Sequence, residues 1–167
     1  MSQFKFQQAE TPTGLTLTFE GDIDEDVEFP KIDAAKYKAI RVELGLVKAI
    51  NSVGIREWLN WIRPLADVSR VTLAHCPKAL VFQLNMVEGF LPKGGVVDSF
   101  YVPFFCEKCD KELNVLFTVG KEVQAGAASP GLAFDLEAAG LCKENACELE
   151  MDASEAKYFQ FLKKISA

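Results

Sequence analysis

Four of the five cysteines in this chain of 167 residues occur as two closely spaced pairs. Cys106 and Cys109 form a C-x2-C pair, and Cys142 and Cys147 form a C-x4-C pair. Zinc prefers four thiolates in a tetrahedron, and a short spacing lets one turn supply two of them. The β-prone run ELNVLFTVG lies between the pairs and predicts a hairpin that brings them together. The spacing therefore predicts a structural zinc site whose four sulfur ligands leave no position for substrate.

Two alternatives to zinc stay open for these cysteines. The pairs are also compatible with a disulfide or with unrelated thiols, and Cys106 and Cys109 could serve a thiol oxidoreductase. Redox chemistry favours a first cysteine at a helix N-terminus, whereas a β-prone run follows here. Cys76 ends a predicted strand and is expected to be a buried small hydrophobe. His75, the only histidine, has no nucleophile at an evident motif spacing and is interpreted as a satisfied surface or strand-end residue.

Ser52 is the second candidate for chemistry, in the stretch AINSVGIREWLNWI. Asn51 and Ser52 stand between an apolar, strand-like run and an amphipathic helix. Either side chain can cap the helix, which contributes about 1 kcal/mol. A phosphate on Ser52 would meet unpaired backbone N–H groups and add a charge of about −1.5 to −2. Capping alone and a modification switch are both consistent with a polar pair at this junction.

Apolar periodicity predicts the elements that position these residues. The first helix is expected to bury a stripe made by Ile55, Leu59, Ile62 and Ala66 and flanked by Trp58 and Leu65. A second helix begins at Pro77, and the acidic segment 21–38 reads as loop with at most a short helix at 33–37. Strands are predicted at residues 3–8, 14–20, 39–47, 70–76 and 95–105. Strands and helices alternate from residue 39 to 105, which is typical of an α/β sheet backed by helices.

The segment NSVGI, placed between a strand and a helix, resembles the signature of the STAS family. The segments VTLAHCPKALVFQLNMVEGF and LTFEGDID are similar to neighbouring parts of the anti-sigma factor antagonists of that family. The resemblance implies an α/β fold with a mixed sheet backed by helices. It also implies that Ser52 is the phosphoacceptor of an anti-sigma kinase. Asn51 stands where the family has an acidic residue, and Val53 where it has a second hydroxyl.

The resemblance also implies a partner-binding surface around Ser52 and the helix that follows. Its expected members are Asn51, Gly54, Arg56, Glu57, Asn60 and Trp61. Trp61 falls at the edge of the solvent-facing stripe, where it could anchor a partner. Covering the rim of the core is an equally good explanation of an amphipathic aromatic residue at that position.

Three parts are predicted along the chain: a STAS-like domain at 1–105, a module resembling a zinc ribbon at 106–151, and a C-terminal helix at 152–167. The cysteine-bearing module has few apolar residues for a core of its own, so zinc would supply its folding free energy. The final helix is expected to pack back on the first domain.

Composition narrows the function further. The chain is 49% hydrophobic and 25% charged, as in ordinary globular proteins. Its formal charge of −6 disfavours nucleic acid as a partner. Neither a signal peptide nor a membrane-spanning run is evident, so a cytoplasmic protein without membrane insertion is expected. We expect a non-enzymatic regulatory module that binds a kinase-like or other signalling protein, with a constitutive scaffold of a bacterial signalling complex as the alternative.

Overall fold

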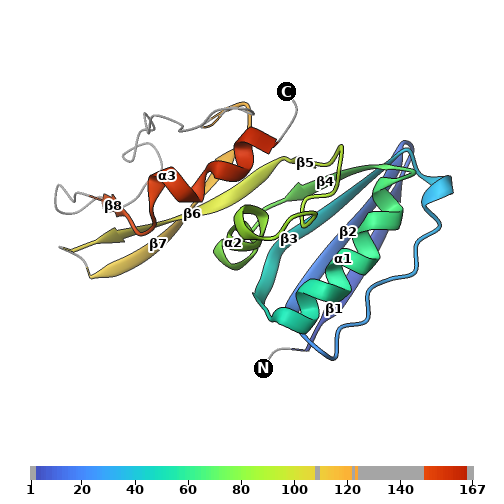
Figure 1. Ribbon diagram of the computed structural model, residues 1–167, viewed down its shortest axis with the longest axis horizontal. Coiled ribbons are helices and arrows are strands. Elements are labelled where there is room, and N and C mark those ends of the chain that lie inside the picture. The colour runs from blue at the N-terminus through green and yellow to red at the C-terminus, as the bar shows by residue number, and fades with distance from the viewer. Residues whose placement is uncertain (1–2, 108–109, 122, 124–148, 165–167) are drawn as a thin grey trace.

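The computed structural model describes residues 3–107, 110–121, 123 and 149–164 (Figure 1). Its strands are β1 (Lys5–Thr11), β2 (Gly14–Ile23), β3 (Ala39–Ile50), β4 (Arg70–Ala74), β5 (Val96–Val97), β6 (Ser99–Cys106), β7 (Lys111–Thr118) and β8 (Leu149–Met151). Its helices are α1 (Ser52–Ala66), α2 (Lys78–Met86) and α3 (Glu155–Tyr158), with the 3-10 turns η1 (Ala34–Lys36) and η2 (Gln160–Lys164). The strands form two separate sheets.

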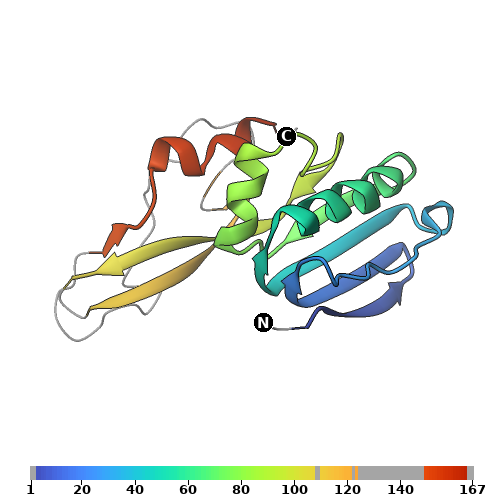
Figure 2. The same cartoon turned by 60° about the horizontal axis from the view of Figure 1, so that its bottom comes forward.

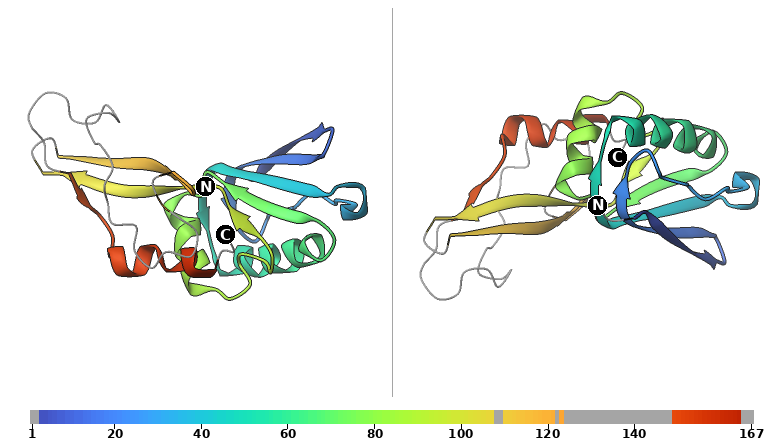
Figure 3. Two further views of the ribbon diagram at one scale, coloured as in Figure 1. Left: turned by 90° about the horizontal axis from the view of Figure 1, so that it is seen from above. Right: turned by 90° about the horizontal axis from the view of Figure 1, so that it is seen from below.

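The first sheet has five strands in the order β1-β2-β3-β4-β5. β1 runs antiparallel to β2, and the remaining neighbours are parallel. Helices α1 and α2 lie on one face of this sheet (Figure 3). The predicted α/β class with a mixed sheet is therefore confirmed.

Alternation along β3 sets which face of the first sheet the helices cover. Ile40, Val42 and Leu44 are fully buried, while Arg41 and Glu43 lie on the opposite, partly exposed face. Successive side chains of a strand point to opposite faces, so one row joins the core and the other row faces solvent. The open face of the sheet is consequently polar at Arg41 and Glu43.

The buried stripe of α1 is shifted from the predicted one toward the predicted flanking residues Trp58 and Leu65. Its fully buried large side chains are Trp58 and Ile62, whereas Ile55 and Leu59 are only partly buried. Gly54 explains the rotation: a Cβ at this position would collide with the backbone carbonyl of Ile23, so the glycine lets the helix approach β2 closely. Because of that contact, the side of α1 that carries Gly54, Trp58 and Ile62 faces the sheet.

The predicted strand at 95–105 is broken in two. Val96 and Val97 extend the first sheet, but the chain turns at Asp98 and the next strand, β6, is the centre of a second, antiparallel sheet in the order β7-β6-β8. The alternation of strands and helices thus ends at β5, inside the part of the sequence assigned to the first domain. The β6–β7 hairpin projects away from the first sheet (Figure 2).

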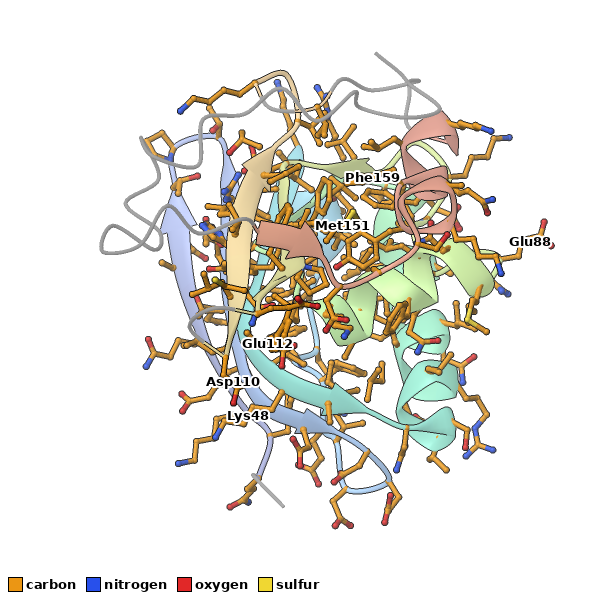
Figure 4. The ribbon with its side chains drawn as sticks, turned by 90° about the vertical axis from the view of Figure 1, so that its left-hand side faces the viewer. Lys48, Glu88, Asp110, Glu112, Met151 and Phe159 are labelled. Carbon is orange, nitrogen blue, oxygen red and sulfur yellow. The ribbon has the colours of Figure 1, made fainter. Side chains whose placement is uncertain are left out.

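The C-terminal segment covers the second sheet with aromatic side chains. The ring of Phe159 stacks on Phe117, with centroids 6.2 Å apart, and the ring of Phe161 meets Phe100 edge-on at 4.9 Å. Figure 4 shows Phe159 inside the molecule and Glu88, after the end of α2, projecting outward. In place of one continuous helix, the segment forms the short α3 followed by η2.

Candidate functional site

Asn51 occupies the junction where β3 ends and α1 begins. Its side-chain Oδ1 accepts a hydrogen bond from the backbone N–H of Gly54 at 2.8 Å, which satisfies one of the unpaired donors of the first helical turn. Its own N–H donates to the carbonyl oxygen of Ile23, which ties the helix start to β2. Asn51 is therefore the N-cap of α1.

Ser52 is the first residue of α1 and is exposed. Among the residues that the structure describes, none forms a hydrogen bond with its hydroxyl. The hydroxyl lies at the positive end of a helix of 15 residues, where unpaired N–H groups and the helix dipole favour negative charge. By its sequence, the helix could be capped by either Asn51 or Ser52. In the structure Asn51 makes the capping hydrogen bond, so capping does not explain the Ser52 hydroxyl.

The acidic loop meets this junction through Glu25. Its Oε2 accepts a hydrogen bond from Nδ2 of Asn51 at 2.7 Å. A backbone hydrogen bond and this side-chain hydrogen bond lower the pKa of Glu25 from its ordinary value. A carboxylate thus already stands close to the N-terminus of α1, bound to the residue that precedes Ser52.

The other residues predicted to bind a partner separate into two groups. Arg56 and Asn60 are exposed, and the Arg56 guanidinium lies 3.5 Å from the carboxylate of Glu57. Gly54 is buried against β2 and offers no surface to a partner. An exposed polar strip on α1 therefore continues from Ser52 toward the C-terminal half of the helix.

Trp61 contacts the acidic loop. Its indole N–H donates to the carbonyl oxygen of Pro30 at 2.8 Å, and its ring stacks on Phe29 at 5.0 Å between centroids. It also lies against the fully buried Trp58. These contacts correspond to the covering of the core rim that the sequence offered as an alternative to a partner anchor.

A second polar cluster, which the sequence did not predict, lies on the open face of the first sheet. The Glu43 carboxylate accepts from Nε of Arg41 at 2.7 Å and lies 2.7 Å from Nδ1 of His75. A second guanidinium nitrogen of Arg41 reaches Asp98 at 3.2 Å. Burial disfavours the charged form of Glu43, but the Arg41 and His75 hydrogen bonds outweigh burial and lower the pKa of this carboxyl.

The backbone at His75 holds this cluster at the boundary between the two sheets. Its φ of 54° is in the left-handed region, which is uncommon for residues other than glycine. The N–H of His75 donates to the hydroxyl of Ser99 at 2.9 Å, and the next residue, Cys76, bridges to Phe100 of the second sheet. The sequence carried one visible signal, the charged pair Arg41 and Glu43 on one face of a strand. It gave no indication that His75 and Asp98 would join them.

The prediction of a four-cysteine zinc site is corrected by the structure. Within residues 3–107, 110–121, 123 and 149–164, no group of three or more His, Cys, Asp or Glu side chains could hold a metal ion. Cys106 is fully buried, because it continues the alternating row of buried side chains on β6 and so joins the apolar core. The remaining three predicted ligands lie outside the described residues: Cys109, Cys142 and Cys147.

Cys76 is the small buried residue that the sequence predicted. It is fully buried, and burial, reinforced by the negative charges of Glu43 and Asp98, raises the pKa of its thiol. A thiol with a raised pKa is a poor nucleophile. Cys106 lies at the end of a strand, whereas redox cysteines favour a helix N-terminus.

The sequence matches no protein-family model and no curated protein sequence. No helix in the described part of the chain combines the length and the apolar character needed to cross a bilayer.

Proposed function

We propose that this protein is a non-enzymatic regulatory module that binds another protein through the surface around Ser52 and α1. In this proposal it resembles the anti-sigma factor antagonists of the STAS family. The observation that carries the proposal is the separation of roles at the helix start: Asn51 makes the capping hydrogen bond, and the adjacent Ser52 hydroxyl is exposed. A capping role accounts for Asn51 and leaves the exposed hydroxyl without a structural task.

The strand order is compatible with the proposed family. An antiparallel first strand, followed by parallel strands that alternate with α1 and α2, is the kind of mixed sheet that the resemblance implies. The segment between β2 and β3 carries only the short η1 where the family has its first helix. The domain limits 1–105, 106–151 and 152–167 stay a prediction, and the first of them assigns nearly all of β6, the central strand of the second sheet, to the first part.

Phosphorylation of Ser52 is the proposed switch. A phosphate there would lie at the N-terminus of α1, where N–H groups and the helix dipole stabilise it. It would also repel Glu25, whose carboxylate is bound to the neighbouring Asn51. One modification would therefore change the charge of the docking surface and weaken the attachment of the acidic loop at the same time.

The position of Glu25 also favours a second candidate function, a constitutive scaffold without phosphorylation. An anionic side chain near a helix N-terminus already provides the favourable charge that a phosphate would supply. A second negative charge beside Glu25 carries a repulsive cost. In this alternative the strip from Ser52 to Asn60 binds a partner without being modified.

Two measurements test the proposal. Intact mass and peptide mapping of protein isolated from its native host would detect a phosphate on Ser52, and a consistently unmodified serine would favour the scaffold. Binding of candidate kinase-like partners is then compared for wild type, Ser52→Asp and Ser52→Ala. Thr13→Asp, in the exposed turn between β1 and β2, is the matched charge control. Equal affinities for all four proteins would remove Ser52 from the mechanism.

A further inference from the structure

β1 is the outermost strand of the first sheet, and only one of its two sides is paired. Among the described strands it pairs with β2 alone. All seven of its residues are exposed, and within the part of the chain that the structure describes no segment other than β2 forms a backbone hydrogen bond with it. Figures 2 and 3 show β1 at the margin of the sheet. An edge strand with free N–H and C=O groups is a template for a further strand.

The turn between β1 and β2 determines which backbone groups of β1 are free. Thr11 and Gly14 flank a turn of two residues and are the last pair of the ladder, so they form a hydrogen-bonded pair. Bonded and non-bonded pairs alternate along an antiparallel ladder, and the register runs through all of β1 without a bulge. Every second residue counted back from Thr11 is therefore bonded to β2. The N–H and C=O groups of Phe6, Gln8 and Glu10 point outward.

β1 lacks the features that usually block the addition of a strand. It contains no proline and no bulge, and its only lysine, Lys5, is its first residue. The opposite edge of the first sheet is β5, which consists only of Val96 and Val97 and is too short to template a partner. The edge of this sheet that can accept a strand is therefore β1.

The two ends of β1 carry opposite charge. At its first residues, three carboxylates and one ammonium group line a hollow: Asp24, Asp26, Glu28 and Lys5. At the turn, two ammonium groups and one carboxylate line a second hollow: Lys36, Lys38 and Glu10. All of these residues except those of β1 belong to the segment between β2 and β3, which packs on α1 through the stacked rings of Phe29 and Trp61. The charged groups of that segment therefore lie on the helix-covered side of the sheet.

We propose that two copies of this chain join through β1 as a two-fold, antiparallel pair, which makes one continuous sheet from the two five-stranded sheets. A strand supplies the alternating acceptors and donors that the outward groups of β1 require. A second copy fits because antiparallel pairing brings the acidic end of each β1 to the basic end of the other, with the helix-covered faces on the same side.

A register centred on Gln8 pairs all seven residues of β1 in each copy. Gln8 then lies opposite Gln8 of the other copy, and Lys5 lies opposite Thr11, so no like charges face each other. The ring of Phe6, which is 42% exposed in the single chain, gains a neighbouring strand that covers it. This interface does not depend on the function proposed for Ser52.

Sedimentation and hydrogen exchange of the full chain test the proposal. Analytical ultracentrifugation is expected to show a reversible equilibrium between monomer and dimer. In dilute protein the outward amides of Phe6, Gln8 and Glu10 should exchange rapidly, and in the dimer their exchange should slow by at least about tenfold. The amides of Gln7 and Ala9, which are bonded to β2, should be protected at every concentration and are the internal control.

Charge variants at the two-fold axis test the symmetry. Gln8→Lys and Gln8→Glu each place two like charges opposite each other, so each alone should raise the dissociation constant of the dimer at least about tenfold. An equimolar mixture of the two variants should restore the dimer, because it sets a lysine opposite a glutamate. Gln160→Lys and Gln160→Glu, at an exposed position of the C-terminal segment, are the matched controls and should leave the dissociation constant unchanged. Circular dichroism verifies that the variants fold.

Five outcomes would overturn the proposal. The first is a chain that remains monomeric at about 1 mM. The second is a dimer that either Gln8 variant leaves intact, and the third is a loss in both Gln8 variants that their mixture does not restore. The fourth is assembly into particles larger than a dimer. The fifth is a monomer whose outward β1 amides are protected only by an extended peptide of alternating Val and Lys, which would assign this edge to a strand of another protein.

Discussion

The two sheets described by the structure share one continuous core, but they acquire their covers in different ways. The first sheet is covered by α1 and α2, which lie between its own strands in the sequence. The second sheet is covered by residues 158–162, which follow β7 only after a long intervening stretch. Local periodicity therefore specifies the cover of the first sheet, whereas the cover of the second depends on contacts between segments far apart in the chain.

The comparison explains why metal was expected in the second part of the molecule. Taken alone, β6 and β7 are a hairpin with an apolar face and nothing to cover it, and isolated hairpins are only marginally stable. Residues 106–151 by themselves indicate a need for an external stabiliser such as zinc. In the structure, aromatic side chains of the C-terminal segment cover that face. The C-terminal segment of the same chain therefore provides the stabilisation that zinc was expected to provide.

The sharpest test of this difference is Phe159→Ala. The Phe159 ring is fully buried against Phe100 and Phe117, so its removal is expected to lower the free energy of unfolding by about 3–5 kcal/mol. Denaturant titration measures the loss, and hydrogen exchange is expected to show it chiefly in β6 and β7. Val68→Ala, at a position 59% exposed, is the control and should change the free energy by no more than about 0.5 kcal/mol. Equal loss of protection in α1 and β6 would mean that the two sheets unfold as one unit and would contradict this expectation.

The next largest effect concerns the part of the core that α1 covers. The indole N–H of Trp58 donates to the buried carbonyl oxygen of Phe90 at 2.9 Å. Trp58→Phe leaves that oxygen without its donor, and the free energy of unfolding should fall by about 1–3 kcal/mol. Trp61→Phe removes a similar bond to Pro30 at a partly exposed site, where water can replace it. A larger loss for Trp61 than for Trp58 in the same denaturant titration would contradict this assignment.

A smaller effect separates the two polar residues at the start of α1. Asn51→Ala should lower the free energy of unfolding by about 1 kcal/mol, because it removes the cap. Ser52→Ala should change it by no more than about 0.5 kcal/mol, because the exposed hydroxyl does not cap the helix. Thermal or chemical denaturation of both variants measures the difference. Equal losses would show that Ser52 shares the capping role.

The smallest effect lies at the boundary between the two sheets. The pKa of Glu43 is lowered in the folded protein from its ordinary value of 4.5, so the carboxylate stabilises the fold fully above that value. The contribution is lost as the pH falls through the lowered pKa. Wild type should therefore lose more stability than Glu43→Gln on acidification below about pH 4.5. Free energies of unfolding measured across that range give the comparison, and parallel curves would exclude Glu43 as the source.

Patterns within single segments made much of the first sheet predictable. β-branched runs bounded by turn residues indicated its strands, and Pro77 marked the start of α2, where it is the N-cap. The sequence placed Trp58 beside the buried stripe of α1, but it gave no sign that the close approach of Gly54 to Ile23 would turn Trp58 into the core. That contact joins two elements and leaves no periodic signal in either one.

The candidate sites were predictable to different degrees. Asn51 and Ser52 were identifiable as a helix start, but both residue types cap helices, and only the geometry assigns the cap to Asn51. The cluster of Glu43, His75 and Asp98 forms because the parallel register and the turn at His75 bring separate segments together. Residues 95–105 are β-prone throughout, so the sequence did not indicate that the first sheet ends before Asp98.

The late position of its covering segment has a consequence for synthesis. Phe117 of the β6–β7 hairpin is made 42 residues before Phe159, the residue that stacks on it (159 − 117 = 42). At about 5–20 residues per second, translation of that interval takes roughly 2–8 s. The aromatic face of a nascent hairpin therefore waits for seconds without its cover, a period in which a chaperone or a neighbouring nascent chain has access to it.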